Sequence, residues 1–423
     1  MRILVVVDCY LPSPKSGAKQ IHDLGVEFRR LGHEVNILAP SDAIAEPLEI
    51  AHEEGMRVVR VRTGKIKATT RILRAFHEAR LSKNLWKGAG RFLRENPCDL
   101  VVFYSPTIFL AELVRELKRE WGCPAYLILR DIFPQWALDM GILRPGPALS
   151  YLRRKERQQY SVADVIAPIS NGDLHYFSRR FPHSHYRLEV LYIWASAEEA
   201  NLPVTSYRRQ LGLEDKVVFF YGGNIGVAQD MDNIVRLAAN VSHDPRIHFL
   251  IVGEGTGAGQ MTQSIAARDL KNIQVLPAVA QREYLAMVAE FDVGLVTLDR
   301  RLKTHNVPAK MLSYLYWGKP VLASINPGND LFAILSECPA GLCLANGDDA
   351  ELSAAALRLA SDAALRDVMG KNARCLLESK FSVRAAAERI LRHFPGPENA
   401  AETATAVPIA ARAPAKQPCS TTY

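Results

Sequence analysis

Several of the common functional signatures are missing from this 423-residue sequence. No apolar run reaches 18 residues, so we expect no membrane-spanning helix. The seven cysteines form no CxxC pair, which argues against a structural zinc site and suits a reducing, cytoplasmic compartment. No GxGxxG, P-loop lysine, HExxH or Ser/His/Asp arrangement occurs. These absences exclude the dinucleotide fingerprint, P-loop nucleotide binding and zinc-protease chemistry.

What is present points to a large protein that binds anions. Apolar residues make up 48% of the chain, and its length predicts two or three domains. The net charge of +7 favours partners such as a nucleotide, a nucleic acid or lipid head groups. No pair of carboxylates with metal-ligand spacing lies near the phosphate-binding candidates described below. We therefore expect no metal and no other cofactor.

The first half of the chain alternates short apolar runs with helical stretches, as a doubly wound α/β domain does. Residues 2–8 predict a strand, and a loop, a helix to about Leu31 and a second strand follow to complete a βαβ unit. The strands expected after the first are Glu34–Pro40, Met56–Arg62, Asp99–Tyr104, Ala125–Leu129, Asp164–Ile169 and Leu188–Leu191. We place this N-terminal domain at residues 1–195.

The second half repeats the alternation after a linker at Glu198–Ser206. Its expected strands are Lys216–Tyr221, Ile247–Val252, Ile273–Leu276, Val293–Leu298, Val321–Ile325 and Gly341–Leu344. We place the C-terminal domain at 205–380, a closing helix at 381–394 and a disordered tail rich in Ala, Pro and Thr at 395–423. Two such domains face a cleft, and ligands bind beyond the carboxyl ends of the strands.

Three elements of the second domain suit an anion such as phosphate. The loop at 221–230 and the loop at 253–257 each carry three glycines, which let backbone N–H groups approach a ligand closely. Pro308 suits the start of a helix, and Lys310 lies in its first turn, where the helix dipole disfavours a cation by about 0.3–1 kcal/mol. A bound anion would account for that lysine, and a solvated surface lysine is the alternative. All three elements should lie at one edge of the sheet.

The first domain offers fewer candidates. Arg130 and Asp131 follow the predicted strand at Ala125–Leu129 and should emerge toward the cleft. Asp131 could orient an acceptor hydroxyl or act as a base, or it could cap the following turn. Gly17, at the start of the first helix, could admit a ligand phosphate or serve as an ordinary turn glycine.

One stretch of the first domain is strongly basic. Between Arg60 and Arg94 there are eleven Lys or Arg residues and a single acid, Glu78. Aromatic and aliphatic residues recur among them at helical spacing, including Phe76 and Trp86. Segment 60–94 therefore predicts contact with an anionic membrane surface. The alternative is a helix packed on the core with a solvated basic face, and no recognisable nucleic-acid module supports nucleic-acid binding.

Several of these motifs together resemble one enzyme family. They are Gly223-Asn-Ile-Gly226, Val252-Gly-Glu-Gly255, Pro308-Ala-Lys-Met-Leu-Ser-Tyr-Leu315 and Asp131-Ile-Phe-Pro134. Over residues 1–392 the chain resembles the family 4 glycosyltransferases of the GT-B fold. It is most similar to a bacterial O-antigen and capsule subgroup that includes N-acetyl-L-fucosaminyl transferases. The resemblance implies two Rossmann-like domains, with the sugar donor bound mainly by the second and the acceptor by the first.

The residues and the resemblance together imply roles for particular side chains. Arg130, Asp131 and Lys310 are the expected catalytic residues. The expected donor-binding residues are Gly17, Gly223, Asn224, Gln229, Gly253, Glu254, Val279, His305, Pro308, Lys310, Met311, Leu312 and Ser313. The acid-x7-acid motif of the wider family falls at His305 and Ser313, neither of which is acidic, and Arg130 replaces a common histidine. The usual assignments for ribose binding and for the sugar-contacting acid therefore do not transfer.

The sequence thus predicts a metal-independent, retaining glycosyltransferase at the inner face of the cytoplasmic membrane. Its expected donor is a UDP-sugar with an N-acetylated deoxyhexosamine, and its expected acceptor is a glycan on polyprenyl diphosphate. Two alternatives stay open: a nucleotide-sugar 2-epimerase of the same fold, and a catalytically silent assembly subunit suggested by His305 and Ser313.

Overall fold

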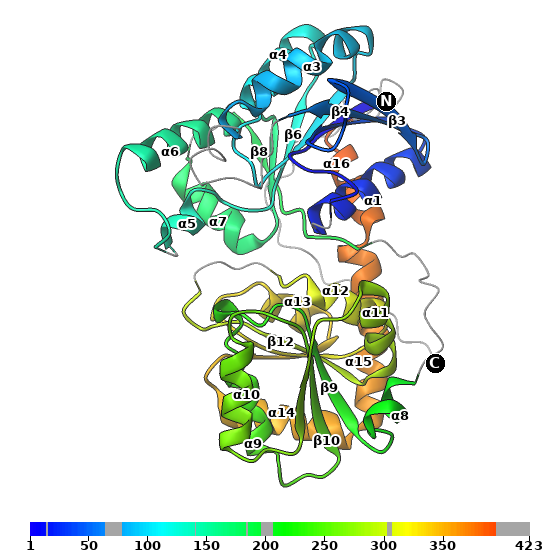
Figure 1. The fold of residues 1–423 in the computed structure, drawn as a ribbon, viewed down its shortest axis with the longest axis vertical. Helices are drawn as coiled ribbons and strands as arrows, with labels where there is room; N and C mark the ends of the chain where they lie inside the picture. Colours follow the sequence, from blue (N-terminus) through cyan, green and yellow to red (C-terminus); the bar gives the residue numbers. More distant parts are fainter. Residues whose placement is uncertain are drawn as a thin grey trace, which may run out of the picture.

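The structure is a computed structural model that describes residues 1–13, 16–63, 78–139, 141–182, 185–195, 206–302 and 307–394. It contains two α/β domains arranged along the long axis of the molecule (Figure 1). The tail at 395–423, most of the predicted linker and residues 64–77 of the basic segment lie outside the described residues. No described helix combines the length and the apolar composition needed to cross a membrane.

The N-terminal domain is built on an eight-stranded sheet in the order β3-β4-β2-β1-β5-β6-β7-β8. Its strands are β1 (Arg2–Val6), β2 (Glu34–Ser41), β3 (Leu48–Glu53), β4 (Met56–Arg62), β5 (Leu100–Tyr104), β6 (Ala125–Leu129), β7 (Val165–Pro168) and β8 (Arg187–Leu188). Its described helices before residue 195 are α1 (Ser16–Arg30), α3 (Leu81–Glu95), α4 (Ala111–Trp121), α5 (Gln135–Asp139), α6 (Pro147–Tyr160) and α7 (Asn171–Arg180). The central strands are buried on both faces, which explains why they read as continuous apolar runs.

The C-terminal domain has a six-stranded parallel sheet in the order β11-β10-β9-β12-β13-β14. Its strands are β9 (Val217–Gly222), β10 (Ile247–Val252), β11 (Ile273–Leu276), β12 (Val293–Thr297), β13 (Val321–Ile325) and β14 (Gly341–Ala345). Its helical elements are α8 (Tyr207–Leu211), η1 (Val227–Gln229), α9 (Met231–Asn240), α10 (Ala258–Ala267), α11 (Gln281–Glu290), α12 (Lys310–Tyr316), α13 (Leu331–Glu337), α14 (Asp349–Ser361), α15 (Ala363–Leu376) and the π-helical η2 (Leu377–Phe381). The sheet reverses its strand order between β9 and β12, where ligands bind in folds of this kind.

The prediction of two doubly wound α/β domains is confirmed, and most predicted strands are present with small shifts at their ends. The strand predicted at Leu188–Leu191 is instead the two-residue β8 at Arg187–Leu188. One strand was missed. β3 pairs antiparallel with β4 through a tight turn at Glu54 and Gly55, whose φ angles are 48° and 79°. Positive φ at both turn residues gives a hairpin turn that matches the twist of the strands. The Glu-Gly pair between two strand-like runs was the available signal.

After η2 the chain leaves the C-terminal domain and returns to the N-terminal one. Helix α16 (Val383–Leu391) follows, with the Ser382 hydroxyl accepting from the Ala385 N–H. At the crossing, Ala195 N–H donates to the Phe381 carbonyl and Val383 N–H donates to the Ala195 carbonyl. The buried side chains of α16 join the core between α1 and the N-terminal sheet (Figure 1). Residues from both ends of the described chain therefore build the first domain.

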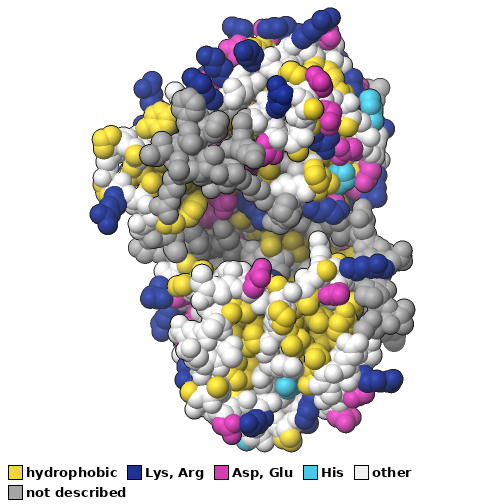
Figure 2. Space-filling model, viewed as in Figure 1, with side chains coloured by type: hydrophobic (Ala, Val, Ile, Leu, Met, Phe, Trp, Pro, Cys, Tyr) yellow, Lys and Arg dark blue, Asp and Glu magenta, His cyan; other side chains and the backbone are white. Residues whose placement is uncertain are grey.

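The described part of the basic segment is a helix packed on the core. Leu81, Leu85 and Leu93 of α3 are buried, and Trp86 and Phe92 pack partly buried against the same cluster. Lys and Arg side chains gather at the end of the N-terminal domain that carries α3 and α4 (Figure 2). The apolar face of α3 is thus occupied by the protein itself. This packing agrees with the alternative of a helix packed on the core with a solvated basic face. Membrane contact by segment 60–94 stays a prediction.

Candidate active site

The two glycine loops and the helix start at Lys310, predicted to suit an anion, meet at one edge of the C-terminal sheet, as predicted. The loop after β9 and the loop after β10 lie so close that a Cβ added to Gly253 would stand 1.9 Å from the Gly223 carbonyl oxygen. A Cβ on Gly223 would lie 3.9 Å from Lys310 Nζ, at the start of α12. Gly223 has a φ of 129°, a conformation that L side chains rarely adopt. The two glycine loops and Lys310 therefore lie close together, and there is no room for a side chain at position 253.

Lys310 is held in a poorly solvated position within this region. Its Nζ lies 3.5 Å from the centroid of the Tyr221 ring. The Tyr221 hydroxyl donates to the Asn224 carbonyl at 2.6 Å, which ties this ring to the glycine loop. Burial lowers the pKa of Lys310 to about 7, and no described carboxylate forms an ion pair that would offset the burial. The lysine is therefore ready to gain from an anionic ligand.

The local sequence around Lys310 folds largely as expected. α12 begins at Lys310, and Gly318, with a φ of 60°, lies just beyond its end. However, the N–H groups of Met311 and Leu312 already donate to the carbonyls of Pro308 and Ala309. The side chains of Met311 and Leu312 lie in the core. Their role in donor binding stays a prediction, and Lys310 is the polar side chain at this helix start.

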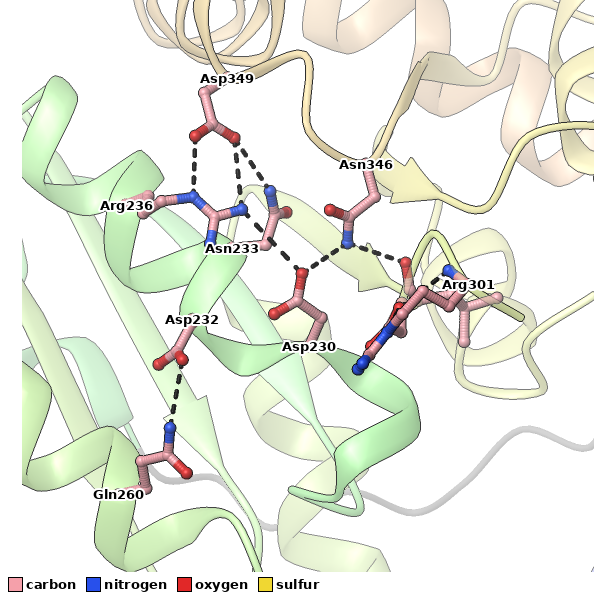
Figure 3. A network of polar contacts seen from close by, with 10 residues as sticks. Asp230, Asp232, Asn233, Arg236, Gln260, Arg301, Asn346 and Asp349 are labelled. Carbon is pink, nitrogen blue, oxygen red and sulfur yellow. Dashed lines mark hydrogen bonds and ion pairs between the residues drawn. The ribbon is translucent and has the colours of Figure 1, made fainter. Parts of the chain in front are cut away.

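A polar network fixes the loops that surround the region (Figure 3). Asn346 donates to the Asp230 carboxylate and to the Leu298 carbonyl, both at 2.9 Å. Arg236 forms an ion pair with Asp349 at 2.8 Å. The network joins the loops that follow β9, β12 and β14. It therefore ties the end of the glycine loop at Asp230 to the neighbouring strand ends.

The predicted donor-binding residues do not all occupy equivalent positions. Asn224 is exposed and donates to Gln229 at 3.0 Å within the glycine loop. Glu254 is also exposed. Ser313 hydrogen-bonds to Tyr284, whose pKa burial raises to about 12. Val279 and Pro308 are partly buried at the ends of their loops, and His305 lies outside the described residues.

A second cluster forms at the carboxyl edge of the N-terminal sheet. Arg130 donates to the Tyr104 hydroxyl at 2.8 Å and to the Gln20 side chain at 2.6 Å. A Cβ on Gly17 would lie 3.0 Å from that hydroxyl, so Gly17 is required for close approach to Tyr104. The structure thus brings the predicted residues Gly17 and Arg130 together through Tyr104 and Gln20, which sequence reasoning missed.

Carboxylates gather beside this cluster. Burial raises the pKa of Asp131, Arg130 lowers it and Asp8 raises it further. Asp173, in α7, has its pKa raised to about 6 mainly by burial, with further contributions from Asp330 and Asp131. Asp330 comes from the other domain, and its carboxylate accepts from the N–H groups of Asn171 and Gly172 at the start of α7. The two strand edges therefore face one another with Asp131 close to the contact between the domains.

Comparison with protein families decides the class of this chain. Residues 17–194 match the profile described as a glycosyl transferase 4-like domain, and residues 204–375 match the profile described as glycosyl transferases group 1. Together the two matches cover most of the chain. The chain belongs to the glycosyltransferases.

Individual relatives agree with that family. The glycosyltransferase is 25% identical to a colanic acid biosynthesis glycosyl transferase of Escherichia coli, WcaI, over 52% of this chain and 56% of the relative. It is 24% identical to glycosyltransferase WbjE of Pseudomonas aeruginosa, over 53% and 57% of the two chains. This glycosyltransferase thus spans little more than half the length of these curated relatives.

Solved structures confirm the fold. HepE of Anabaena, in complex with UDP, superposes with a TM-score of 0.66 at 14% identity, over 93% of this chain and 99% of that one. The GT-B architecture predicted for this glycosyltransferase is therefore confirmed. The expected fucosaminyl-transferase subgroup is not among the findings, which support the broader family.

Proposed function

We propose that the protein is a retaining, metal-independent glycosyltransferase of surface polysaccharide synthesis. It moves a sugar, an N-acetylated deoxyhexosamine, from a UDP-sugar to a glycan carried on polyprenyl diphosphate at an anionic membrane surface. The name of the colanic acid relative and the UDP held by the HepE structure support this class of reaction and donor. The resemblance of the Pro308–Leu315 motif to fucosaminyl transferases supports the choice of sugar.

The observation that carries the proposal is the position of Lys310 beside two glycine loops. When the glycosidic bond of a UDP-sugar breaks, negative charge develops on the departing diphosphate. A diphosphate seated against Gly223 and Gly253 would lie close to the Lys310 ammonium, which rests over the Tyr221 ring. The anion would restore the pKa of the lysine, so the charged form is present when it is needed. Charge on the leaving group is then stabilised by the protein's own residues.

The facing edge of the N-terminal domain would receive the acceptor. Asp131 lies there with a pKa raised by burial, which makes it a better proton acceptor than an ordinary aspartate. Arg130 is held in place by Tyr104 and Gln20. We assign to Asp131 the role of orienting the acceptor hydroxyl. Arg130 would offset negative charge as the two domains close on their substrates.

Steady-state kinetics on Lys310→Ala test this assignment. An interaction that strengthens as the bond breaks lowers kcat when it is lost, and a lost charged contact of about 3 kcal/mol corresponds to roughly a hundredfold. The stabilisation that UDP gives in thermal melts should shrink in parallel. Lys371→Ala, in α15, is the matched control for the loss of a lysine elsewhere in the domain. Normal kcat and a normal UDP shift would remove Lys310 from the site.

The same assay separates the alternatives. Conversion of the UDP-sugar without any acceptor would identify an epimerase, and absence of turnover with a range of donors and acceptors would identify a silent subunit. Transfer that depends on an acceptor supports the proposal.

A further inference from the structure

Exposed apolar side chains concentrate in one short stretch of the N-terminal domain. Among the described residues, large hydrophobic side chains are strongly exposed at only six positions. Three of them lie between residues 136 and 151: Trp136 is 38% exposed, Ile142 60% and Tyr151 45%. Several hydrophobic side chains show at the edge of the domain where α6 lies, among polar and basic ones (Figure 2). Grouped apolar side chains on a protein surface mark places that contact another protein, a ligand or a membrane.

Backbone hydrogen bonds fix the loop between α5 and α6 that carries Ile142. The N–H groups of Ile142 and Leu143 both donate to the Ala137 carbonyl, which folds the loop back against α5. Trp136 packs against Phe133 with ring centroids 6.1 Å apart, so its ring is braced while one side stays exposed. The loop from 141 to 146 therefore folds back on α5 while the Ile142 side chain stays exposed.

Arginines supply most of the exposed charge around the lobe that α5 and α6 form, although the buried Glu156 of α6 interacts electrostatically with Arg153 and Arg157. Arg144, Arg154 and Arg157 are exposed, and Arg153 is half-buried. Among the described residues, the salt bridge of α6 is that of Lys155 with Glu112, and none includes these four arginines. On α3 and α4, by contrast, Arg91, Arg94 and Arg119 pair with neighbouring glutamates. Arg144 and Arg154 thus place exposed positive charge on the same lobe as exposed aromatic and aliphatic groups.

We infer that the α5–α6 lobe, rather than α3, is the surface that docks on an anionic bilayer. Trp and Tyr favour the boundary between head groups and acyl chains, and arginines attract anionic head groups. The apolar face of α3 is already used by the core, whereas the lobe offers both kinds of contact. The lobe also begins directly after Asp131, so docking would bring a lipid-carried acceptor to the candidate site. The inference rests on the membrane association proposed above.

Vesicle binding tests the inference. Full-length protein is sedimented with mixed phosphatidylcholine–phosphatidylglycerol vesicles at low salt. Arg144→Gln/Arg154→Gln should weaken binding roughly 25-fold, because each basic residue near such a surface contributes about fivefold. Ile142→Ser should weaken binding severalfold, and added salt should not mask that loss. Lys83→Gln/Lys87→Gln removes the same charge from exposed positions of α3 and should stay within twofold of wild type.

The outcomes are distinct. A larger loss from the α3 pair than from the lobe pair would overturn the inference in favour of segment 60–94. Absence of wild-type binding would overturn both the lobe and the proposed membrane association. If Ile142→Ser instead abolishes a dimer in analytical ultracentrifugation and leaves vesicle binding intact, the lobe is a protein interface and the inference fails. UDP-induced melting shifts, measured on every variant, report the donor site separately and should not change.

Discussion

Replacing Lys310 with methionine should change how stability depends on pH. Burial lowers the pKa of Lys310 from 10.5 to about 7. Below pH 7 the amine is charged in both the folded and unfolded states, and its burial costs at most roughly 5 kcal/mol, at about 1.4 kcal/mol per pKa unit. Between pH 7 and 10.5 only the unfolded state stays protonated, so wild-type stability rises with pH. At pH 9 the remaining cost is roughly 2 kcal/mol.

Methionine keeps the apolar stem and removes the titrating group. Lys310→Met should therefore be more stable than wild type at pH 6, and its advantage should shrink by roughly 3 kcal/mol by pH 9. Urea unfolding of both proteins at pH 6 and pH 9 measures this change in relative stability. Differences in packing between lysine and methionine cancel in the comparison because they do not depend on pH. Lys319→Met is the control. Burial lowers the pKa of Lys319 too, but Asp292 and Glu290 oppose the effect, so its pH dependence should be smaller.

Proton uptake provides an independent measurement. If UDP restores the charge on Lys310, binding at pH 8 should take up about 0.9 proton per site, the fraction that is neutral in the free protein at a pKa of about 7. The terminal phosphate of UDP, whose second pKa is about 6, is already ionised at pH 8. Calorimetry in two buffers of different ionisation enthalpy counts these protons, and Lys310→Met should take up none. Parallel pH–stability curves together with equal proton uptake would refute the reasoning.

Three further outcomes follow from the geometry. Gly253→Ala should destabilise the fold by about 1–3 kcal/mol, since its Cβ would meet the Gly223 carbonyl, whereas Gly259→Ala in α10 has open space and should stabilise it slightly in chemical denaturation. Transfer should continue in EDTA, and loss of activity that Mg²⁺ or Mn²⁺ restores would count against the scheme. Asp330→Ala removes both contacts to the start of α7 and should enlarge the apo protein in solution scattering, while Asp362→Ala, which caps α15 within one domain, should not.

The fold was largely predictable because its strands are buried on both faces and are separated by helices. Local sequence carries that pattern, so the strands and the positions of Gly223, Gly253 and Lys310 at one sheet edge followed from it. β3 was missed because it is a short edge strand with mixed polarity, paired through a turn of Glu54 and Gly55. Its signal lay in the turn rather than in the strand.

The candidate site was predictable only in part. The contact between Lys310 and Tyr221 joins residues on different elements, and so do the contacts of Arg130 with Tyr104 and Gln20. No spacing along the chain indicates such pairs. Met311 and Leu312 were expected at the donor as part of the 308–315 motif, and helical geometry turns their side chains into the core. Asp330 could not be foreseen, since its partners belong to the other domain.

The return of α16 to the first domain affects how the protein is made. Val383, Ala386, Ala387 and Ile390 belong to the core beside α1, yet they are synthesised after the whole second domain. A ribosome adding about 5–20 residues per second needs roughly 10–40 s to proceed from residue 195 to residue 390. During that interval the nascent first domain exposes the apolar surface that α16 later covers. Termination before residue 383 would make this exposure permanent, so a shortened chain should depend on chaperones even though its candidate sugar-transfer residues are all present.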